Sequence, residues 1–287
     1  MMKNKKILIS GGTGFIGTYL VNALKENNEV YSISRSKGSQ NNVTWIQQDL
    51  GEELDTSRLP SEIDIVIHLA MDPLRGESTK SKLKGISINF LGTYQLLEYA
   101  KKASAKTFLF TSTGSIYGNK ENPSKEEDKF DANDFYSFTK YAAELLVNQY
   151  KENFTIIILR PFHPYGPGQK DSFLVPRLIK NIRNNETINV NNKETPKLSP
   201  IYIEDAINII LKSLKLNENL VLNAAGNKFY SVYDICEIIG RLLNKKVNYN
   251  FINDKNTKNL LGDMEYTSTK LSYIPKTNLE EGIKKLL

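Results

Sequence analysis

Short apolar runs alternate with longer stretches of helical periodicity between residues 6 and 160 of the 287-residue chain. A run of this kind that is apolar throughout indicates a strand covered on both faces, which is typical of parallel sheets with helices on each side. The pattern therefore predicts an α/β fold with a doubly wound parallel sheet. The predicted strands are residues 6–10, 30–34, 43–47, 63–70, 107–112 and 156–159, and the main helical stretches are 15–24, 81–102 and 135–153.

After Arg160 the pattern changes, because Pro161, Pro164, Gly166, Pro167 and Gly168 interrupt any regular element. Beyond this loop we expect helices at 172–183, from 204 and at 232–243, with strands near 188 and 221. We predict a dinucleotide-binding domain at 1–165, to which 200–224 return. Residues 166–199 and 225–287 then form a smaller substrate-binding region.

Composition excludes several classes of protein. With 40% hydrophobic and 24% charged residues, the chain is neither disordered nor fibrous. One cysteine cannot form an internal disulfide, and one cysteine with two histidines cannot form a His/Cys metal site without carboxylate ligands, so we predict no metal. The amino-terminal apolar run is too short for a signal peptide or a membrane span, which favours a cytoplasmic protein. The net charge of +6 is scattered, so we expect neither nucleic-acid nor membrane partners.

A glycine array follows the first predicted strand directly. Gly11, Gly14 and Gly17 have the spacing GxxGxxG and lie where a helix should begin. Such a turn lets backbone amides approach a pyrophosphate, and the helix dipole favours its negative charge. Glycines also occur in tight turns without a ligand, but the alternating pattern around this one favours dinucleotide binding.

The end of the second strand bears on which dinucleotide is bound. NAD-binding chains usually place an acidic residue there, which accepts hydrogen bonds from the ribose. Here Ser34, Arg35 and Ser36 follow, and the Arg35 guanidinium could bind a 2′-phosphate. We therefore predict a preference for NADP(H), with NAD(H) possible. Asp49, after the third strand, is a candidate for the adenine amino group.

Tyr136 and Lys140 are four residues apart in a segment of helical periodicity, so both side chains should lie on one face. An ammonium beside a phenol stabilises the phenolate, so we predict that Lys140 lowers the pKa of Tyr136. Tyr136 could then serve as a general acid/base for a sugar hydroxyl or carbonyl.

With these features in place, the chain resembles the extended short-chain dehydrogenase/reductase family of nucleotide-sugar epimerases, dehydratases and ketoreductases. The resemblance covers nearly the whole chain. It rests on GGTGFIG (11–17), HLA (68–70), NFLGT (89–93), TSTGSIYG (111–118), YSFTK (136–140), RPFHPYGPG (160–168) and IYIEDA (201–206). It implies a Rossmann-type domain, a small carboxyl-terminal region that closes over a nucleoside-diphosphate sugar, and a homodimer formed through the two long helices.

The resemblance also implies roles for individual residues. Thr113, Tyr136 and Lys140 correspond to the catalytic triad, with Ser112 or Ser115 as alternatives to Thr113. The implied cofactor contacts, besides the residues already named, are Thr13, Phe15, Ile16, Leu50, Leu69, Ala70 and Pro161. The implied substrate contacts are Ser115, His163, Arg177 and Lys197. His163 stands where the family usually has asparagine; if protonated it could meet phosphate, and otherwise it packs in the loop as a neutral imidazole. Leu198 replaces an expected arginine, for which Arg177 is the candidate substitute.

Two departures from the family pattern narrow the expected chemistry. Gly114 and Ser115 stand where 4,6-dehydratases carry an acid pair, and Ser115 replaces the cysteine of the C3/C5-epimerising reductases. The favoured prediction is an NADPH-dependent 4-ketoreductase acting on an NDP-4-keto-6-deoxyhexose. The alternative is an NAD-dependent nucleotide-sugar 4-epimerase, similar to UDP-glucose 4-epimerase. A non-catalytic dinucleotide sensor and an RNA-binding protein are more remote alternatives.

Overall fold

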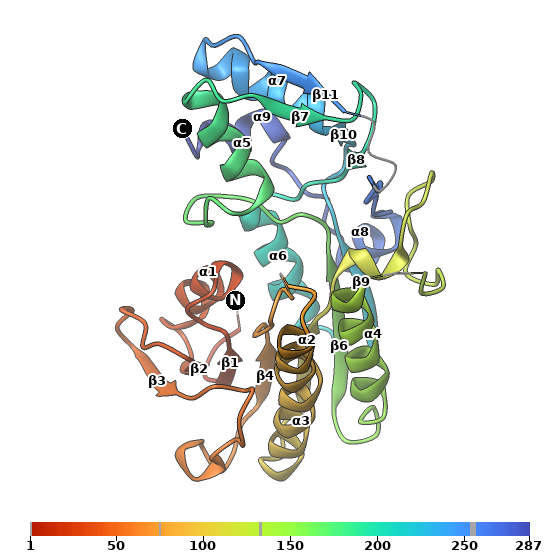
Figure 1. Cartoon of the computed structure of the whole chain (residues 1–287). Coiled ribbons are helices and arrows are strands. Elements are labelled where there is room, and N and C mark those ends of the chain that lie inside the picture. The colour runs from red at the N-terminus through yellow and green to blue at the C-terminus, as the bar shows by residue number, and fades with distance from the viewer. Residues whose placement is uncertain (1, 75, 132–133, 253–256) are drawn as a thin grey trace. The chain divides into compact units, whose positions relative to one another are not determined.

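The computed structural model describes residues 2–74, 76–131, 134–252 and 257–287. They form two compact units. One contains residues 1–116, 132–160 and 210–222, and the other contains 117–131, 161–209 and 223–287. Figure 1 shows the elements and their labels. No helix of the described part of the chain is both long and apolar enough to cross a membrane.

The first unit is built on a seven-stranded sheet with the order β3-β2-β1-β4-β5-β6-β9. The pairings β3–β2, β2–β1, β1–β4, β4–β5 and β5–β6 are all parallel. The strands are β1 (Lys6–Ser10), β2 (Glu29–Ser34), β3 (Val43–Gln47), β4 (Ile65–His68), β5 (Thr107–Thr111), β6 (Thr155–Pro161) and β9 (Leu220–Ala224). This arrangement confirms the predicted Rossmann-type fold.

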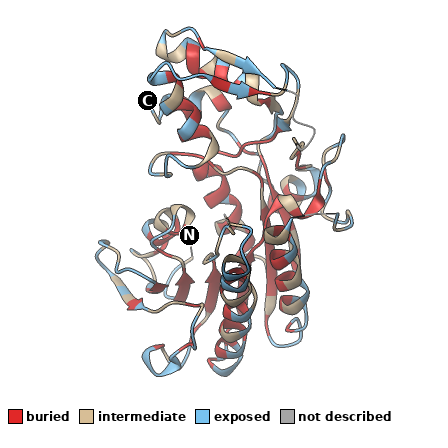
Figure 2. Ribbon diagram, in the orientation of Figure 1, coloured by how far each residue is buried: buried red, intermediate tan, exposed pale blue. Residues whose placement is uncertain are grey.

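Burial along the strands explains their order. All residues of β4 and β5 are buried, whereas the edge strand β3 alternates between exposed and more buried positions (Figure 2). Central strands of a parallel sheet need apolar side chains on both faces because helices cover both. The runs IVIH and TFLFT meet this need, and they lie at the centre of the sheet as their composition predicts.

The helices of this unit present apolar stripes to the sheet. α1 (Phe15–Leu24) buries Leu20, Val21 and Leu24, which recur at helical spacing. The predicted helix at 81–102 is instead α2 (Thr79–Ile86), a π-helical turn η2 (Ser87–Leu91) and α3 (Gly92–Lys102). α4 (Phe135–Asn148) begins at the side-chain cap of Asp134 and ends before the predicted residue 153. Short 3₁₀ turns are η1 (Thr56–Arg58) and η3 (Gly114–Tyr117).

The second unit contains two small sheets. In one, β10 (Tyr230–Ser231) is antiparallel to β8 (Lys197–Leu198), and in the other β11 (Tyr249–Phe251) is parallel to β7 (Ile188–Val190). Its helices include α5 (Leu174–Arg183), α7 (Val232–Leu243), α8 (Glu265–Leu271) and α9 (Leu279–Lys284), while α6 (Ile203–Ser213) continues into the first unit. A Ser231 capping box fixes the start of α7, at the residue predicted from the sequence.

Candidate active site

The carboxyl ends of β1 and β4 adjoin each other at the switch point of the sheet, where ligands bind in folds of this class. Gly11 follows β1, and Leu69 and Ala70 follow β4. The φ of Gly11 is 76°, and a Cβ there would lie 2.9 Å from the Ala70 nitrogen. Only glycine therefore fits this close approach of two chain segments.

The amino terminus of α1 has the features needed to bind a diphosphate. Its N-cap, Gly14, provides no side-chain hydrogen bond. Among the hydrogen bonds of the described residues, none takes up the N–H groups of Phe15, Ile16 or Gly17. A Cβ on Gly17 would lie 2.2 Å from the Gly11 carbonyl oxygen, so the turn depends on glycine. Free amides and the helix dipole at one point suit the pyrophosphate of a dinucleotide.

The segments after β2 and β3 contain the predicted adenosine contacts. The Thr13 N–H donates to the Ser34 hydroxyl at 3.3 Å, which joins the glycine turn to the end of β2. Arg35 is exposed, and its carbonyl accepts a hydrogen bond from the Gln47 side chain at 2.9 Å. One Asp49 carboxylate oxygen accepts the Gly51 N–H at 3.0 Å and so caps its own turn. Leu50 is buried beside it.

A buried chain of hydrogen bonds, not predicted from the sequence, lies beneath these strand ends. The Ser10 hydroxyl is 2.6 Å from His68 Nδ1 and accepts the Leu69 and Ala70 N–H groups, each at 3.2 Å. His68 Nε2 is 2.9 Å from the Thr93 hydroxyl, which itself donates to the Asn89 carbonyl at 2.7 Å.

The donors among these hydrogen bonds determine the tautomer and the protonation state of the His68 ring. Because Thr93 donates to Asn89, its oxygen must accept from Nε2–H, and Nδ1 must accept from Ser10. Burial lowers the pKa of His68 well below its ordinary value, with a further contribution from Lys140, which agrees with a neutral ring. His68 thus holds the backbone at Ala70 through Ser10.

Asn89 is a second residue whose role the sequence did not indicate. It lies in the π-helical turn η2, a feature often found at functional sites. Its amide oxygen accepts the Asp72 N–H at 2.7 Å, and its nitrogen donates to the Asp72 carbonyl and to the Thr139 hydroxyl, each at 3.0 Å. Asn89 therefore ties the loop after β4 to α4.

Thr113 and Tyr136 meet in the first unit. Thr113 follows β5, and its hydroxyl accepts the Ser115 N–H at 3.2 Å. Tyr136 lies in the first turn of α4, near enough to Thr113 for that side chain to lower the pKa of its phenol. Ser112 and Ser115 are the alternatives to Thr113, and the Ser112 hydroxyl is buried without a partner within the described residues.

Lys140 lies one turn after Tyr136 and is 2% exposed. Its Nζ is 4.2 Å from the centre of the Phe110 ring. Burial lowers the pKa of Lys140 to about 7, and Glu144 opposes this shift. Burial raises the pKa of Tyr136, Asp134 adds to the increase, and Thr113 opposes it. The pKa of Tyr136 is therefore raised overall and not lowered as predicted, because desolvation of the phenolate dominates.

The residues predicted to bind substrate other than Ser115 lie in the second unit, as does Pro161 at the end of β6. His163 has a left-handed backbone with a φ of 44°, and its Nδ1 is buried without a hydrogen-bond partner within the described residues. Burial lowers the pKa of His163 to about 4, so the ring is neutral at neutral pH. Of the protonated and neutral states that the sequence leaves open, the neutral one is therefore the stable one. Arg177 on α5 and Lys197 on β8 are both exposed.

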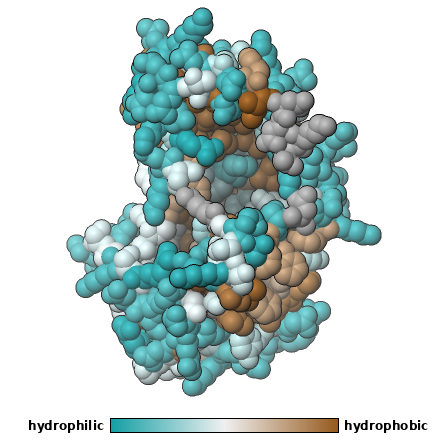
Figure 3. Space-filling model, in the orientation of Figure 1, coloured by the Kyte–Doolittle hydropathy of each residue, from teal (hydrophilic) through white to brown (hydrophobic). Residues whose placement is uncertain are grey.

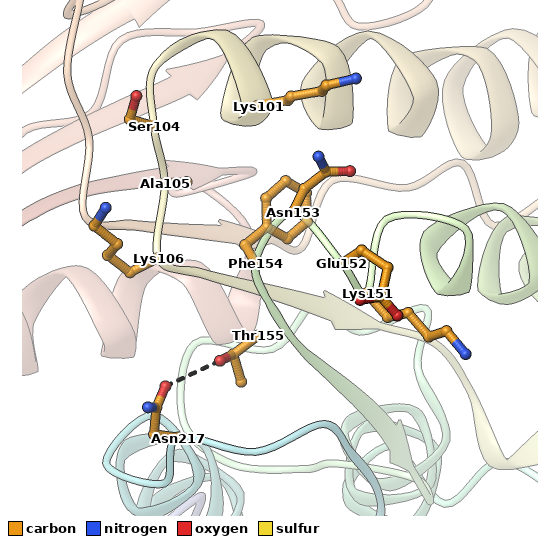
Figure 4. Close-up of a pocket in the computed structure, with 10 residues that line it drawn as sticks. All are labelled: Lys101, Ser104, Ala105, Lys106, Lys151, Glu152, Asn153, Phe154, Thr155 and Asn217. Atoms are coloured by element: carbon orange, nitrogen blue, oxygen red, sulfur yellow. Dashed lines mark hydrogen bonds between the residues drawn. The ribbon is translucent and has the colours of Figure 1, made fainter.

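A pocket of about 480 Å³ lies elsewhere, at the amino ends of β5 and β6. Lys101, Lys106 and Lys151 are among its lining residues, but Figure 4 shows their side chains pointing in different directions. Its dashed line joins the Thr155 hydroxyl to Asn217 at 3.1 Å. No candidate cofactor or substrate residue lines this pocket, and its lysines do not converge on a common point.

The chain is similar over almost its whole length to several known proteins. UDP-glucuronic acid 4-epimerase from Bacillus cereus, solved with UDP-glucuronic acid and NAD, matches with a TM-score of 0.89 and 28% identity over 98% of this chain and 97% of that one. UDP-glucuronate 4-epimerase of Thermodesulfobacterium geofontis is 29% identical over 97% of this chain and 94% of its own length. UDP-glucuronic acid decarboxylase 3 of Arabidopsis thaliana is 27% identical over 98% of this chain and 87% of its own.

These relatives are enzymes, and the chain is likewise an enzyme. Two of them are 4-epimerases and none of the three is a 4-ketoreductase, so they fit the epimerase alternative better than the favoured prediction. The solved relative holds NAD, which supports NAD(H) and does not confirm a preference for NADP(H). Residues 7–225 match the NAD dependent epimerase/dehydratase family, to which this chain belongs.

Proposed function

We propose that the chain is an NAD-dependent UDP-sugar 4-epimerase. The observation that carries this proposal is the Tyr136 phenol, which lies near Thr113 and one turn before a buried Lys140. The group stands after β5, in the unit whose glycine turn offers free amides for a dinucleotide. The similarity to 4-epimerases over almost the whole chain supports the same reaction here.

The residues of the first unit fit the cofactor. Backbone amides of Phe15, Ile16 and Gly17 would bind the diphosphate, and Asp49 lies among the predicted adenosine contacts. The bound nicotinamide would supply the acceptor, and later the donor, for a hydride at the sugar carbon. Ala70, held by the Ser10 hydroxyl, would border the site.

Tyr136 would carry the proton in this reaction. As the C4 hydroxyl becomes a ketone, the phenolate form of Tyr136 would take the hydroxyl proton, and the resulting phenol would return it when the ketone is reduced from the opposite face. Thr113 would orient the same oxygen of the sugar. Charged Lys140 would stabilise the phenolate, so catalysis depends on an ammonium that burial makes easy to deprotonate.

Gly114 and Ser115 support a reaction at C4 alone. Elimination across C5 and C6 needs an acid and a base beside the tyrosine, and neither residue can supply one. The 4-ketoreductase remains the second candidate, because exposed Arg35, rather than an acidic residue, follows β2. The two reactions differ in whether the cofactor is recycled on the protein.

The experiment is to release and identify the cofactor of the purified protein. The protein as isolated is then incubated with UDP-glucose or UDP-glucuronic acid, without added cofactor, and followed by NMR. We expect retained NAD and conversion to the 4-epimer, with Tyr136→Phe losing about 10²- to 10⁴-fold of the rate. Protein that is isolated empty, consumes NADPH and reduces a 4-keto-6-deoxy sugar would instead establish the ketoreductase.

We also propose that His163, Arg177 and Lys197 contact the nucleoside-diphosphate sugar. Arg177 and Lys197 are exposed cations that would attract a diphosphate, whereas neutral His163 would act as a hydrogen-bonding group. Replacing Arg177 with methionine should raise KM for the UDP-sugar with little change in the affinity for NAD. An unchanged KM would remove Arg177 from the substrate site.

A homodimer through the long helices is proposed as well. The exposed apolar side chains of α2, η2, α3 and α4 gather into the patch visible in Figure 3, and they include Leu83, Leu91, Tyr94, Phe138 and Leu145. A patch of this kind marks an interaction surface. Leu145→Lys should lower the mass measured by light scattering from two chains to one, whereas an unchanged mass would exclude this surface.

The cytoplasmic location stays a prediction.

A further inference from the structure

A buried ion pair includes Glu144, the residue one helical turn after Lys140 on α4. Arg160 Nε donates to one carboxylate oxygen of Glu144 at 3.0 Å, and its NH2 donates to the other at 2.7 Å. The two side chains are 8% and 3% exposed, respectively. Since this bidentate contact engages both carboxylate oxygens, it is strong and fixed in geometry.

The carboxylate of this pair belongs to the turn that follows Lys140. Glu144 is four residues after Lys140 on α4, which is the spacing at which a lysine and a glutamate pair along a helix. Lys140 nevertheless makes no hydrogen bond or ion pair among the contacts found for the described residues. Its Nζ instead lies over the Phe110 ring of β5.

We propose that Arg160 is a positioning residue that holds Glu144 away from Lys140, so that the ammonium stays free to act on the Tyr136 phenol and the cofactor. This inference rests on the proposed function, in which Lys140 must reach both. Without Arg160, a buried carboxylate one turn away would be left unpaired, and Lys140 is the nearest cation on the same helix. A Lys140–Glu144 ion pair would then replace the interaction of Lys140 with the Tyr136 phenol and the cofactor.

The charges around Lys140 determine in which direction its pKa should change in each variant. Lys140 interacts electrostatically with the neutral His68 on β4 and with Glu144 on α4, while Tyr136 is one turn before it on α4 and Arg160 on β6 pairs with Glu144. Freeing Glu144 from Arg160 would strengthen its attraction for the ammonium and raise the pKa of Lys140. Removing the Glu144 charge while Arg160 remains would lower that pKa, because the attraction that opposes the effect of burial would be lost.

The experiment compares Arg160→Met, Glu144→Gln and the double variant with the wild type. The Lys140 titration is followed by NMR of the side-chain Cε in protein labelled on lysine, with Lys140→Met used for assignment. We expect the Lys140 pKa to rise by about one unit or more in Arg160→Met and to fall in Glu144→Gln. The double variant, which removes both charges, should return it close to the wild-type value.

Epimerase activity is measured over pH on the same proteins. Arg160→Met should lose at least about tenfold in kcat, and the double variant should recover most of that loss although it removes more of the native contact. Arg241→Met, which breaks the exposed Arg241–Glu280 pair at 2.6 Å, is the matched control and should change neither readout.

The outcomes separate this proposal from the proposed function. Lys140 titrations that coincide in all variants would overturn the positioning role, whatever the activity. If the Lys140 pKa shifts in the expected directions but the protein has no epimerase activity, the proposed epimerase function is refuted. The proposed effect of Arg160 and Glu144 on Lys140 then still stands. Arg160→Met alone could fail to fold because it leaves Glu144 unpaired. In that case the fall of the Lys140 pKa in Glu144→Gln, and its return in the double variant, still test the positioning role of Arg160.

Discussion

Replacing Ser10 with alanine tests whether the hydrogen-bond chain beneath the cofactor site stabilises the first unit. The Ser10 and His68 side chains are 0% and 1% exposed. The substitution removes one oxygen and adds no bulk, so its effect reports the lost hydrogen bonds. His68 Nδ1 and the Ala70 N–H would both lose the partner they have in this structure, whereas the Leu69 N–H keeps the Ser10 carbonyl at 3.1 Å.

The size of the effect follows from these two groups. A buried polar group left without a partner costs about 1–3 kcal/mol. His68 is fully buried, and Ala70 is partly exposed and should be at the lower end. We therefore expect Ser10→Ala to lower the free energy of unfolding by about 2–4 kcal/mol. At about 2–3 °C per kcal/mol for a chain of this size, Tm falls by roughly 4–12 °C.

The assay is calorimetric unfolding, together with a titration of NAD, because Ala70 borders the glycine turn. Thr18→Ala is the control. Its hydroxyl donates to the Gly14 carbonyl at 2.9 Å from an exposed position, so its loss should cost below about 1 kcal/mol. If Ser10→Ala lowers the free energy of unfolding no more than Thr18→Ala does, the hydrogen bonds of Ser10 and His68 do not stabilise the first unit. The assignment of the His68 tautomer then fails as well.

Three further substitutions test other features of the site. The Nδ1 atom of His163 is buried, and burial lowers the pKa of the ring to about 4, so the native protein loses stability as pH falls from 6.5 toward 4, by about 1.4 kcal/mol per pH unit. His163→Asn, which cannot be protonated and suits a positive φ, should flatten that part of the pH dependence of the free energy of unfolding in urea, and an equal slope would contradict the burial of the ring nitrogen. Gly17→Ala places a Cβ 2.2 Å from the Gly11 carbonyl oxygen and should weaken NAD binding at least about tenfold in calorimetry. Gly76→Ala is the control, because the nearest atom to its Cβ is 3.2 Å away, and this variant should bind NAD normally. Arg35→Asp should lower the affinity for NADPH about tenfold more than that for NADH, and an unchanged ratio would remove Arg35 from the cofactor site.

Local pattern was sufficient for most of the fold. The strands β1 and β3 and the helix α7 have the predicted ends, because alternating or helical periodicity and cap residues act over a few residues. The same reasoning failed at η2, where continuous apolar periodicity gave no sign of a π-helical turn. It also missed β8, β10 and β11, since strands of two or three residues have no periodicity to detect.

The sequence by itself determined the glycine turn at Gly11 and the Tyr136–Lys140 pair, since both depend on spacing within one turn and its neighbouring helix. Only the tertiary structure decided which state these groups adopt. Tyr136 has a raised pKa rather than a lowered one because segments distant in the sequence remove water from it. The pairing of Arg160 with Glu144, 16 residues apart, likewise arises only when β6 and α4 pack together, since a buried charge must find its partner there.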